Sequence, residues 1–105
     1  YLYTSNGKIS GGGSANSVSN FLINSLAGSL TSIVTAPAGP YAVGNNTRPM
    51  SVTVDPTGRF VYTGNYGAAK VSGFSLNSAN GTLTPVTGAT FAVSTNPTQL
   101  LIVEE

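Results

Sequence analysis

The chain of 105 residues has no cysteine, histidine or tryptophan, and only 7% of its residues are charged. Without cysteine, no disulfide can hold the fold. Without cysteine and histidine, there is no His/Cys metal site and no histidine-based catalytic triad. Four basic and three acidic residues provide too little positive charge for a nucleic-acid-binding surface. No apolar run approaches the length of a membrane span. We therefore expect no cofactor, no nucleic-acid partner and no membrane span.

Small and polar residues dominate what is present. Glycine, serine, threonine and asparagine make up nearly half of the chain, and hydrophobic residues make up 40%. The length suits one domain. A folded surface normally carries about a quarter charged residues, so here hydroxyl and amide groups must solvate it. This composition is typical of secreted β proteins and predicts an extracellular or cell-surface location, with a cytosolic repeat fragment as the alternative. Because the chain starts at Tyr1 without a signal peptide, we expect it to be processed, excised from a longer protein or engineered.

The sequence pattern predicts an all-β fold. Glycine, proline and asparagine interrupt every stretch before a helical period develops, and turn signals separate short alternating runs. The clearest unit has four predicted strands, at residues 51–55, 60–65, 70–76 and 82–86. Asp55, Pro56 and Gly58 predict a tight turn between the first two strands, because each suits its turn position. Pro85 predicts that the fourth strand lies at an outer edge.

This unit occurs twice, with a period of about 50 residues. Residues 18–31 align without gaps with residues 71–84, and eight of these fourteen pairs are identical. Residues 8–16 form the largest insertion, in a loop of the first copy. The remaining matches pair residues 2–6 with 61–65, 41–43 with 91–93, 51–54 with 99–102, and Pro49 with Pro97.

A four-stranded repeat of this length predicts β-propeller blades of four antiparallel strands. If the strands of a blade are lettered A to D from the central axis outward, the chain reads B, C, D, then A, B, C, D, and then A. The prediction is a single two-blade module over residues 1–105. Its first blade (1–34) lacks the innermost strand, and its second blade (49–86) is complete. Residues 97–103 are an innermost strand that completes a neighbouring or following blade.

The repeat resembles that of lactonase-type β-propellers. This family includes proteins similar to 6-phosphogluconolactonase and bacterial surface proteins with a Tyr-Val-Thr-Asn repeat. The resemblance rests on residues 48–49, 51–65, 71–74 and 80–83. The tetrapeptide stands here as Tyr-Thr-Gly-Asn at residues 62–65 and Tyr-Thr-Ser-Asn at residues 3–6. The resemblance implies seven blades in a complete member and a central funnel lined by His, Arg and Glu. Because this chain has no histidine and its glutamates are terminal, no catalytic residue is carried over and no enzyme activity is predicted.

Five side chains are candidates for chemistry, and each has a structural interpretation. Asp55 is the only internal carboxylate, and we interpret it as a turn former because no second acid or base accompanies it. Asn6 and Asn65 end matching strands, where we expect them to cap exposed turns rather than contact a ligand. Tyr3 and Tyr62 are expected to pack between blades, with stacking on a sugar as the alternative.

Two stacked blades cover only the faces between them, which predicts assembly. An uncovered face with about ten apolar side chains forfeits on the order of 20 kcal/mol, more than the usual net stability of about 5–15 kcal/mol. We therefore expect three or four copies to close a ring, or a filament to form, through head-to-tail strand addition. The predicted self-association strands are Tyr1, Leu2, Tyr3 and Thr4 of one copy and Gln99, Leu100, Leu101, Ile102 and Val103 of its neighbour.

The leading hypothesis is thus a non-catalytic, self-assembling propeller module with a structural or binding role, completed by strand exchange between copies. One alternative is a fragment of a longer lactonase-type hydrolase. The other is a secreted carbohydrate-binding surface protein that contacts a glycan.

Overall fold

The computed structural model describes residues 1–8 and 16–103 and confirms the predicted all-β fold class. Within this part, one 3-10 turn, η1 (Tyr66–Ala68), is the only helical element, and no helix is long and apolar enough to cross a bilayer. The strands are β1 (Leu2–Asn6), β2 (Ser17–Ile23), β3 (Leu30–Ser32), β4 (Tyr41–Ala42), β5 (Pro49–Val54), β6 (Phe60–Asn65), β7 (Lys70–Leu76) and β8 (Leu83–Ala92). Most of the predicted insertion in the first copy lies outside the described residues.

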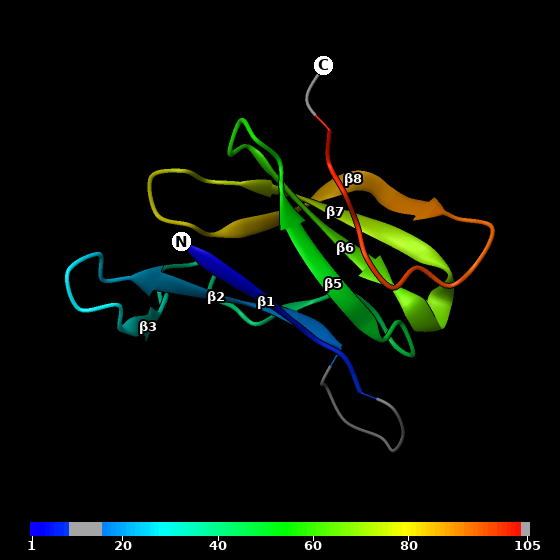
Figure 1. Ribbon diagram of the computed structural model, residues 1–105, viewed down its shortest axis with the longest axis horizontal. Helices are drawn as coiled ribbons and strands as arrows, with labels where there is room; N and C mark the ends of the chain where they lie inside the picture. The colour runs from blue at the N-terminus through cyan, green and yellow to red at the C-terminus, as the bar shows by residue number, and fades with distance from the viewer. Residues whose placement is uncertain (9–15, 104–105) are drawn as a thin grey trace.

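The strands form two antiparallel four-stranded sheets (Figure 1). The first sheet has the order β1-β2-β3, with β4 also paired to β2, and the second sheet has the order β5-β6-β7-β8. In the second sheet each strand pairs with its neighbour in the sequence, because short turns join consecutive antiparallel strands. In the first sheet β4 is the exception, since it pairs with β2. The second sheet corresponds to the complete four-stranded unit predicted at residues 51–86.

The predicted turn between β5 and β6 is confirmed. The Asp55 carboxylate accepts hydrogen bonds from the backbone N–H groups of Thr57, Arg59 and Phe60 and from the Thr57 hydroxyl. Gly58 has a φ of 71°, which suits glycine because it has no Cβ. The hydrogen bond from the Thr57 hydroxyl is the largest cause that lowers the pKa of the Asp55 carboxyl, and the backbone hydrogen bonds add to it. Asp55 therefore organises the turn, as its position in the sequence predicts.

The repeat in the sequence is also a repeat in strand register. Tyr3 of β1 lies opposite Asn20 of β2, and the equivalent Tyr62 of β6 lies opposite Gly73 of β7. Every pair between β1 and β2 has its equivalent between β6 and β7 at the same alignment offsets. Positions that match in the sequence therefore occupy the same place in the two sheets.

The outermost strand differs between the two sheets. β8 runs as one strand along β7 at the edge of its sheet, as Pro85 predicted. In the first sheet β3 and β4 share that position, since β3 pairs with one end of β2 and β4 with the other. Residues 33–40 interrupt this strand, because they contain two prolines, which cannot donate to a ladder.

These outer strands reach further along the chain than the sequence predicted. β4 ends at Ala42, whereas the first blade was predicted to end at residue 34. β8 ends at Ala92, whereas the second blade was predicted to end at residue 86. The sequence after Val86 contains Gly88, and glycine is a residue type that favours turns. Gly88 instead has a φ of 71° within the strand, next to a register irregularity against β7, so the pairing continues past it.

The sheets stack face to face, and the core lies between these inner faces. Its best-covered aromatic contact joins the rings of Tyr41 in the first sheet and Phe74 in the second, with centroids 6.4 Å apart. The buried hydrophobic residues of this core are Val18, Tyr41, Val43, Val61, Phe74 and Leu83. Each sheet thus supplies half of the core, and each sheet keeps an outer face that the other does not cover.

Asn65 is buried inside the sheet, so the expectation that it caps an exposed turn is wrong. It is 0% exposed. The Thr63 hydroxyl donates to Asn65 Oδ1 at 2.9 Å, and Asn65 Nδ2 donates to Ser72 Oγ at 2.7 Å. In the first sheet Asn6 Nδ2 donates to Ser19 Oγ at 2.8 Å in the same way. The alternation of side chains along a strand turns this position inward, and its amide is satisfied there by the neighbouring strand.

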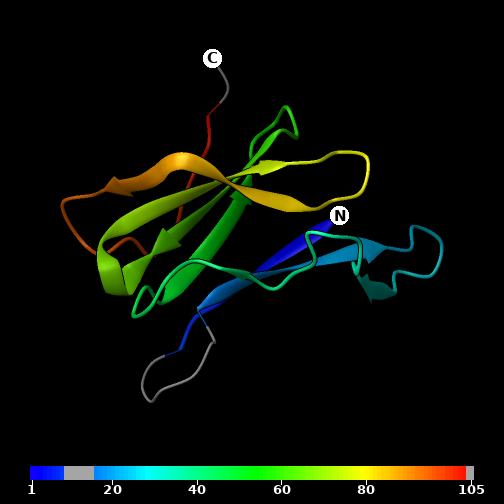
Figure 2. The same cartoon turned by 180° about the vertical axis from the view of Figure 1, so that it is seen from behind.

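Residues 97–103, which we call the tail, form no strand within the chain. A Cβ built at Gly64 of β6 would lie 3.4 Å from the side chain of Leu100. Gly64 faces away from the core because its neighbours Thr63 and Asn65 face into it. The tail therefore lies on the outer face of the second sheet. Figure 1 shows it crossing in front of that sheet, and Figure 2 shows it behind the sheet, with the segment that contains β4 on the near side.

The tail lies against the second sheet at a position that corresponds in the repeat to β5 against the first sheet. Leu100 is the repeat equivalent of Val52 in β5, and Gly64 is the equivalent of Ser5 in β1. β5 lies against β1 in the chain, as the tail lies against β6. The tail makes no strand ladder there, because a strand needs a partner edge and the described part of the chain has none beside it.

Candidate functional site

The two sets of residues predicted for self-association lie apart in the chain. Tyr1 precedes β1, and Leu2, Tyr3 and Thr4 lie in β1, whose only strand partner among the described residues is β2. The other edge of β1 is open. The second set, residues 99–103, lies in the tail on the far side of the second sheet. Because the second sheet separates the two sets, pairing between them has to join different copies.

The covered contact between the sheets is centred on the turn that contains Gly81. The Tyr3 hydroxyl donates to the Gly81 carbonyl at 2.8 Å, and Asn20 Nδ2 donates to the same oxygen at 3.1 Å. The Tyr1 hydroxyl donates to the Ser78 carbonyl at 3.2 Å. For Tyr3, the predicted packing between blades is confirmed. Sequence reasoning missed Asn20, whose repeat equivalent is a glycine, so no repeated signal marked it.

Burial raises the pKa of the Tyr3 hydroxyl to about 12, and nearby tyrosines add to the shift. The hydroxyl donates its proton to Gly81, so the neutral form is the one that stabilises the stacked sheets. Its contribution is fully present below a pH of about 10, the ordinary tyrosine pKa, and is lost as the pH rises through about 12.

We therefore expect Tyr3→Phe to lower the free energy of unfolding by about 1 kcal/mol at neutral pH, the typical value of one hydrogen bond. The same variant should lose less stability than the unmodified chain between about pH 9 and about pH 11, which lie one unit below and above tyrosine's ordinary pKa. Urea unfolding followed by circular dichroism measures both effects. An alkaline loss of equal size in the two proteins would contradict the assignment to Tyr3.

The outer face of the second sheet is the open equivalent of the inner face of the first. Tyr41 and Val43 are each 8% exposed in the core between the sheets. Their repeat equivalents Phe91 and Val93 are 53% and 37% exposed. Residues of the same kind in the same strand register are thus covered in one sheet and uncovered in the other.

The outer face of the first sheet is likewise the open equivalent of the inner face of the second. Leu83 is 1% exposed in the core, whereas its equivalent Leu30 is 49% exposed. Phe74 is 2% exposed, whereas its equivalent Phe21 is only half-buried. The chain therefore has two faces that no sheet covers, which we call the uncovered faces, and they match the two faces that already pack together between its sheets.

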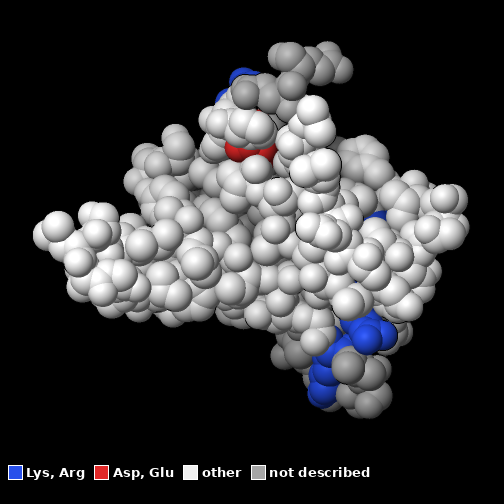
Figure 3. All heavy atoms as spheres, in the orientation of Figure 1, with Lys and Arg blue, Asp and Glu red and all other residues white. Residues whose placement is uncertain are grey.

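Both uncovered faces are almost free of charge. Among the residues of the eight strands, Lys70 at the start of β7 is the only charged one. Figure 3 shows a broad uncharged surface over the sheets, with the coloured charged atoms gathered toward the top and bottom of the view. Covering these faces with a further sheet therefore leaves no strand carboxylate or interior strand cation to be desolvated, which is the main cost of burying a surface.

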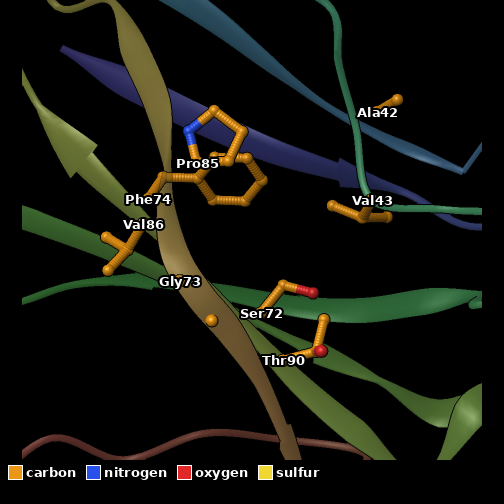
Figure 4. A pocket seen from close by; sticks show the side chains of 9 residues that line it. Ala42, Val43, Ser72, Gly73, Phe74, Pro85, Val86 and Thr90 are labelled. Atoms are coloured by element: carbon orange, nitrogen blue, oxygen red, sulfur yellow. The ribbon is translucent and has the colours of Figure 1, made fainter.

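A cavity of about 280 Å³ opens where the segment after β4 faces β7 and β8 (Figure 4). Its polar groups include the hydroxyls of Ser72 and Thr90, and Ser72 Oγ already accepts a hydrogen bond from Asn65. None of the lining residues is titratable, so the cavity contains no acid or base. It is lined by Ala42, Val43, Ser72, Gly73, Phe74, Pro85, Val86, Gly88 and Thr90.

Three of the four side chains considered for ligand contact are engaged inside the chain, and one of them, Asn6, donates from Nδ2 to Ser17 Oγ and Ser19 Oγ. Tyr3 is hydrogen-bonded to Gly81, and Asn65 is buried between Thr63 and Ser72. Asp55 is the only carboxylate among the described residues, and its oxygens are held by its own turn. The described residues contain no group of three side chains able to hold a metal ion.

Stacked four-stranded antiparallel sheets with a repeat of about 50 residues are the architecture of β-propeller blades. A family model described as "Lactonase, 7-bladed beta-propeller" matches residues 3–102. The chain therefore belongs to the lactonase family of seven-bladed β-propellers, and the resemblance found in the sequence is confirmed. No curated protein and no solved structure gives a significant match to it.

Proposed function

We propose that this chain is a non-catalytic propeller module that assembles head-to-tail with further copies of itself, in a structural or binding role at the cell surface or outside the cell. The observation that carries the proposal is the equivalence of its faces. The outer face of the second sheet carries the repeat equivalents of the residues on the inner face of the first sheet. The outer face of the first sheet carries the equivalents of those on the inner face of the second sheet. A neighbouring copy supplies the missing partner on each side.

The open backbone groups support the same arrangement. In the proposed assembly, the first sheet of a neighbouring copy covers the second sheet of this copy. The β1 strand of the neighbour then lies beside the tail of this copy, as β6 lies beside β5 within the chain. The open edge of β1 then pairs with residues 99–103, and the first blade of the neighbour gains its innermost strand. Strand addition of this kind satisfies backbone donors and acceptors on both segments.

The absence of catalysis in this proposal rests on the residues at hand. Asp55 belongs to a turn, and the cavity beside β7 and β8 has no titratable lining. The sequence contains no histidine, and general acid–base catalysis needs a positioned proton donor or acceptor. An assembly or binding role needs none of these groups.

The family match favours one second candidate, a segment of a longer lactonase-type propeller. The matching family has seven blades, whereas copies with two blades each close rings with an even number. Three copies supply six blades and four supply eight, both within the range of about 4–8 blades seen in closed propellers. In the second candidate, further blades of the same polypeptide cover the two faces and carry the catalytic residues.

Native mass spectrometry and sedimentation of the 105-residue chain test these two functions. We expect three or four copies in a closed ring, or a longer series of masses if the contacts run on as a filament. A folded and stable single chain that does not associate at high concentration would overturn self-assembly. That result would favour the segment of a longer propeller.

A further inference from the structure

The turn that contains Gly28 is the open equivalent of the covered turn at Gly81. Gly28 and Gly81 have φ angles of 69° and 75°. The Gly28 N–H donates to the Asn24 carbonyl at 2.8 Å, and the Gly81 N–H donates to the Asn77 carbonyl at 2.7 Å. The two turns therefore present their glycine carbonyls with the same local backbone structure.

The surroundings of the two glycines differ. A Cβ built at Gly81 would lie 2.5 Å from the ring of Tyr1 and 2.8 Å from Ile33. The Gly81 carbonyl also accepts hydrogen bonds from Tyr3 and Asn20. A Cβ built at Gly28 would have nothing within 4 Å. The Gly28 turn therefore has the same local backbone as the Gly81 turn, but no side chain of the described part of the chain covers it.

Tyr62 is the open equivalent of the donor in that contact. It matches Tyr3 in the repeat and in strand register. Among the described residues its hydroxyl has no hydrogen-bond partner, while its ring lies 6.4 Å from that of Phe60, its neighbour on the same outer face. Phe60 is the repeat equivalent of Tyr1. Phe60 and Tyr62 therefore repeat the aromatic pair, Tyr1 and Tyr3, that covers Gly81, but no turn of the described chain lies against them.

We propose that the Tyr62 hydroxyl of one copy donates a hydrogen bond to the Gly28 carbonyl of the next copy, and that this contact sets the register of the head-to-tail interface. The inference rests on the proposed self-assembly, and it names the atoms that join the copies. The partner is a second copy because the equivalent turn at Gly81 is covered by an aromatic pair that includes a hydroxyl donor. The second sheet of the same sequence carries such a pair, Phe60 and Tyr62, on its outer face.

The contact also determines the direction of assembly. Each copy carries the donor on the outer face of its second sheet and the acceptor on the outer face of its first. The two faces are different surfaces, so each copy uses one of them toward each neighbour. Such a heterologous contact produces rings or filaments and excludes a symmetric pair closed by two identical faces.

The test compares Tyr62→Phe with Tyr3→Phe, because each removes one equivalent hydroxyl. Sedimentation should show that Tyr62→Phe weakens association between copies about three- to tenfold, the range of a neutral hydrogen bond. Tyr3→Phe should lower the unfolding midpoint of the chain with less effect on association. Unchanged association in Tyr62→Phe, while the unmodified protein assembles, would overturn this contact alone. A non-associating unmodified protein would overturn the proposed function itself.

A second pair of variants tests the acceptor side. Gly28→Asn places a side chain where the aromatic pair of the neighbour must lie, and asparagine tolerates the left-handed backbone. Gly58→Asn is the matched control, because Gly58 has a φ of 71° and also nothing within 4 Å of its Cβ position. We expect Gly28→Asn to weaken association more than tenfold and Gly58→Asn to leave it unchanged. Equal association in both variants would overturn the role of Gly28.

Discussion

Deletion of residues 97–105 is expected to convert the assembled protein into single chains. In the proposed assembly, the tail supplies the backbone segment that pairs with the open edge of β1 in a neighbouring copy. No tail residue belongs to the core between the sheets, so the two sheets should keep their fold. Native mass spectrometry of the shortened chain measures the loss of assembly, and circular dichroism measures the retained strand content.

Two controls separate strand pairing from other effects of the terminus. A chain shortened only by residues 104–105 keeps the whole tail and should assemble like the full chain. Leu101→Pro keeps the length of the tail but removes one N–H donor, and Leu101 is 86% exposed in the chain, so this variant should weaken assembly without unfolding the sheets. Oligomers that persist after deletion of the tail would show that strand exchange does not hold the copies together.

Phe74→Ala is expected to lower the free energy of unfolding by about 3–5 kcal/mol, the usual cost of truncating a buried phenylalanine. Phe74 is 2% exposed and packs against the ring of Tyr41 across the two sheets. Its removal leaves a cavity in the middle of the one core that both sheets share. Urea unfolding followed by circular dichroism at several protein concentrations measures the loss, which should be present at all of them.

Phe21→Ala is the matched comparison, because Phe21 holds the equivalent position in the first sheet and is half-buried on its outer face. In dilute solution, where copies separate, this variant should cost much less than Phe74→Ala. Its cost should rise where copies associate, because association buries the ring. Equal losses for the two variants at every concentration would mean that the outer face of the first sheet is not covered by a neighbour.

These variants follow from one structural property, which is that the described chain buries apolar residues on only one side of each sheet. A propeller blade normally has a neighbour on both faces, and closure removes the exposed faces and edges. Phe91 and Leu30, both about half exposed, lie on the two faces that no neighbouring sheet covers. Covering them would add apolar burial at about 25 cal/mol per Å², with almost no charge to desolvate.

The buried hydrogen bonds around Asn65 show where sequence reasoning fails. The residue ends a strand and is followed by a short loop, which is a common position for an exposed cap. Its burial depends on how the second sheet packs against the first, and no local pattern encodes that packing. A signal was available in the repeat, since Thr63, Asn65 and Ser72 have equivalents at Thr4, Asn6 and Ser19. Three polar residues that recur together in both copies indicate that their side chains are hydrogen-bonded to one another, rather than that each one caps a separate turn.

The outer strands show a second limit of sequence reasoning. The predicted fourth strand ended at residue 86, two residues before Gly88, and glycine favours turns. In the structure β8 passes through it with a register irregularity, since β7 continues alongside and offers hydrogen bonds on both sides of the glycine. The two prolines of residues 33–40 do break the equivalent strand. A single proline, Pro85, is tolerated within β8, whereas the equivalent strand is interrupted where two prolines lie close together.

The sequence by itself determined the repeat, the all-β fold class, the turn at Asp55 and the membership of the propeller family. These properties depend on local backbone preferences and on identical residues at equal spacing, which are visible without coordinates. Only the tertiary structure decided which face of each sheet is covered, that Asn65 lies inside, that the Gly81 turn receives Tyr3 and that the Gly28 turn stays open. Those outcomes depend on how one sheet sits on the other, because burial and hydrogen-bond partners between sheets are set by contacts between residues far apart in the chain.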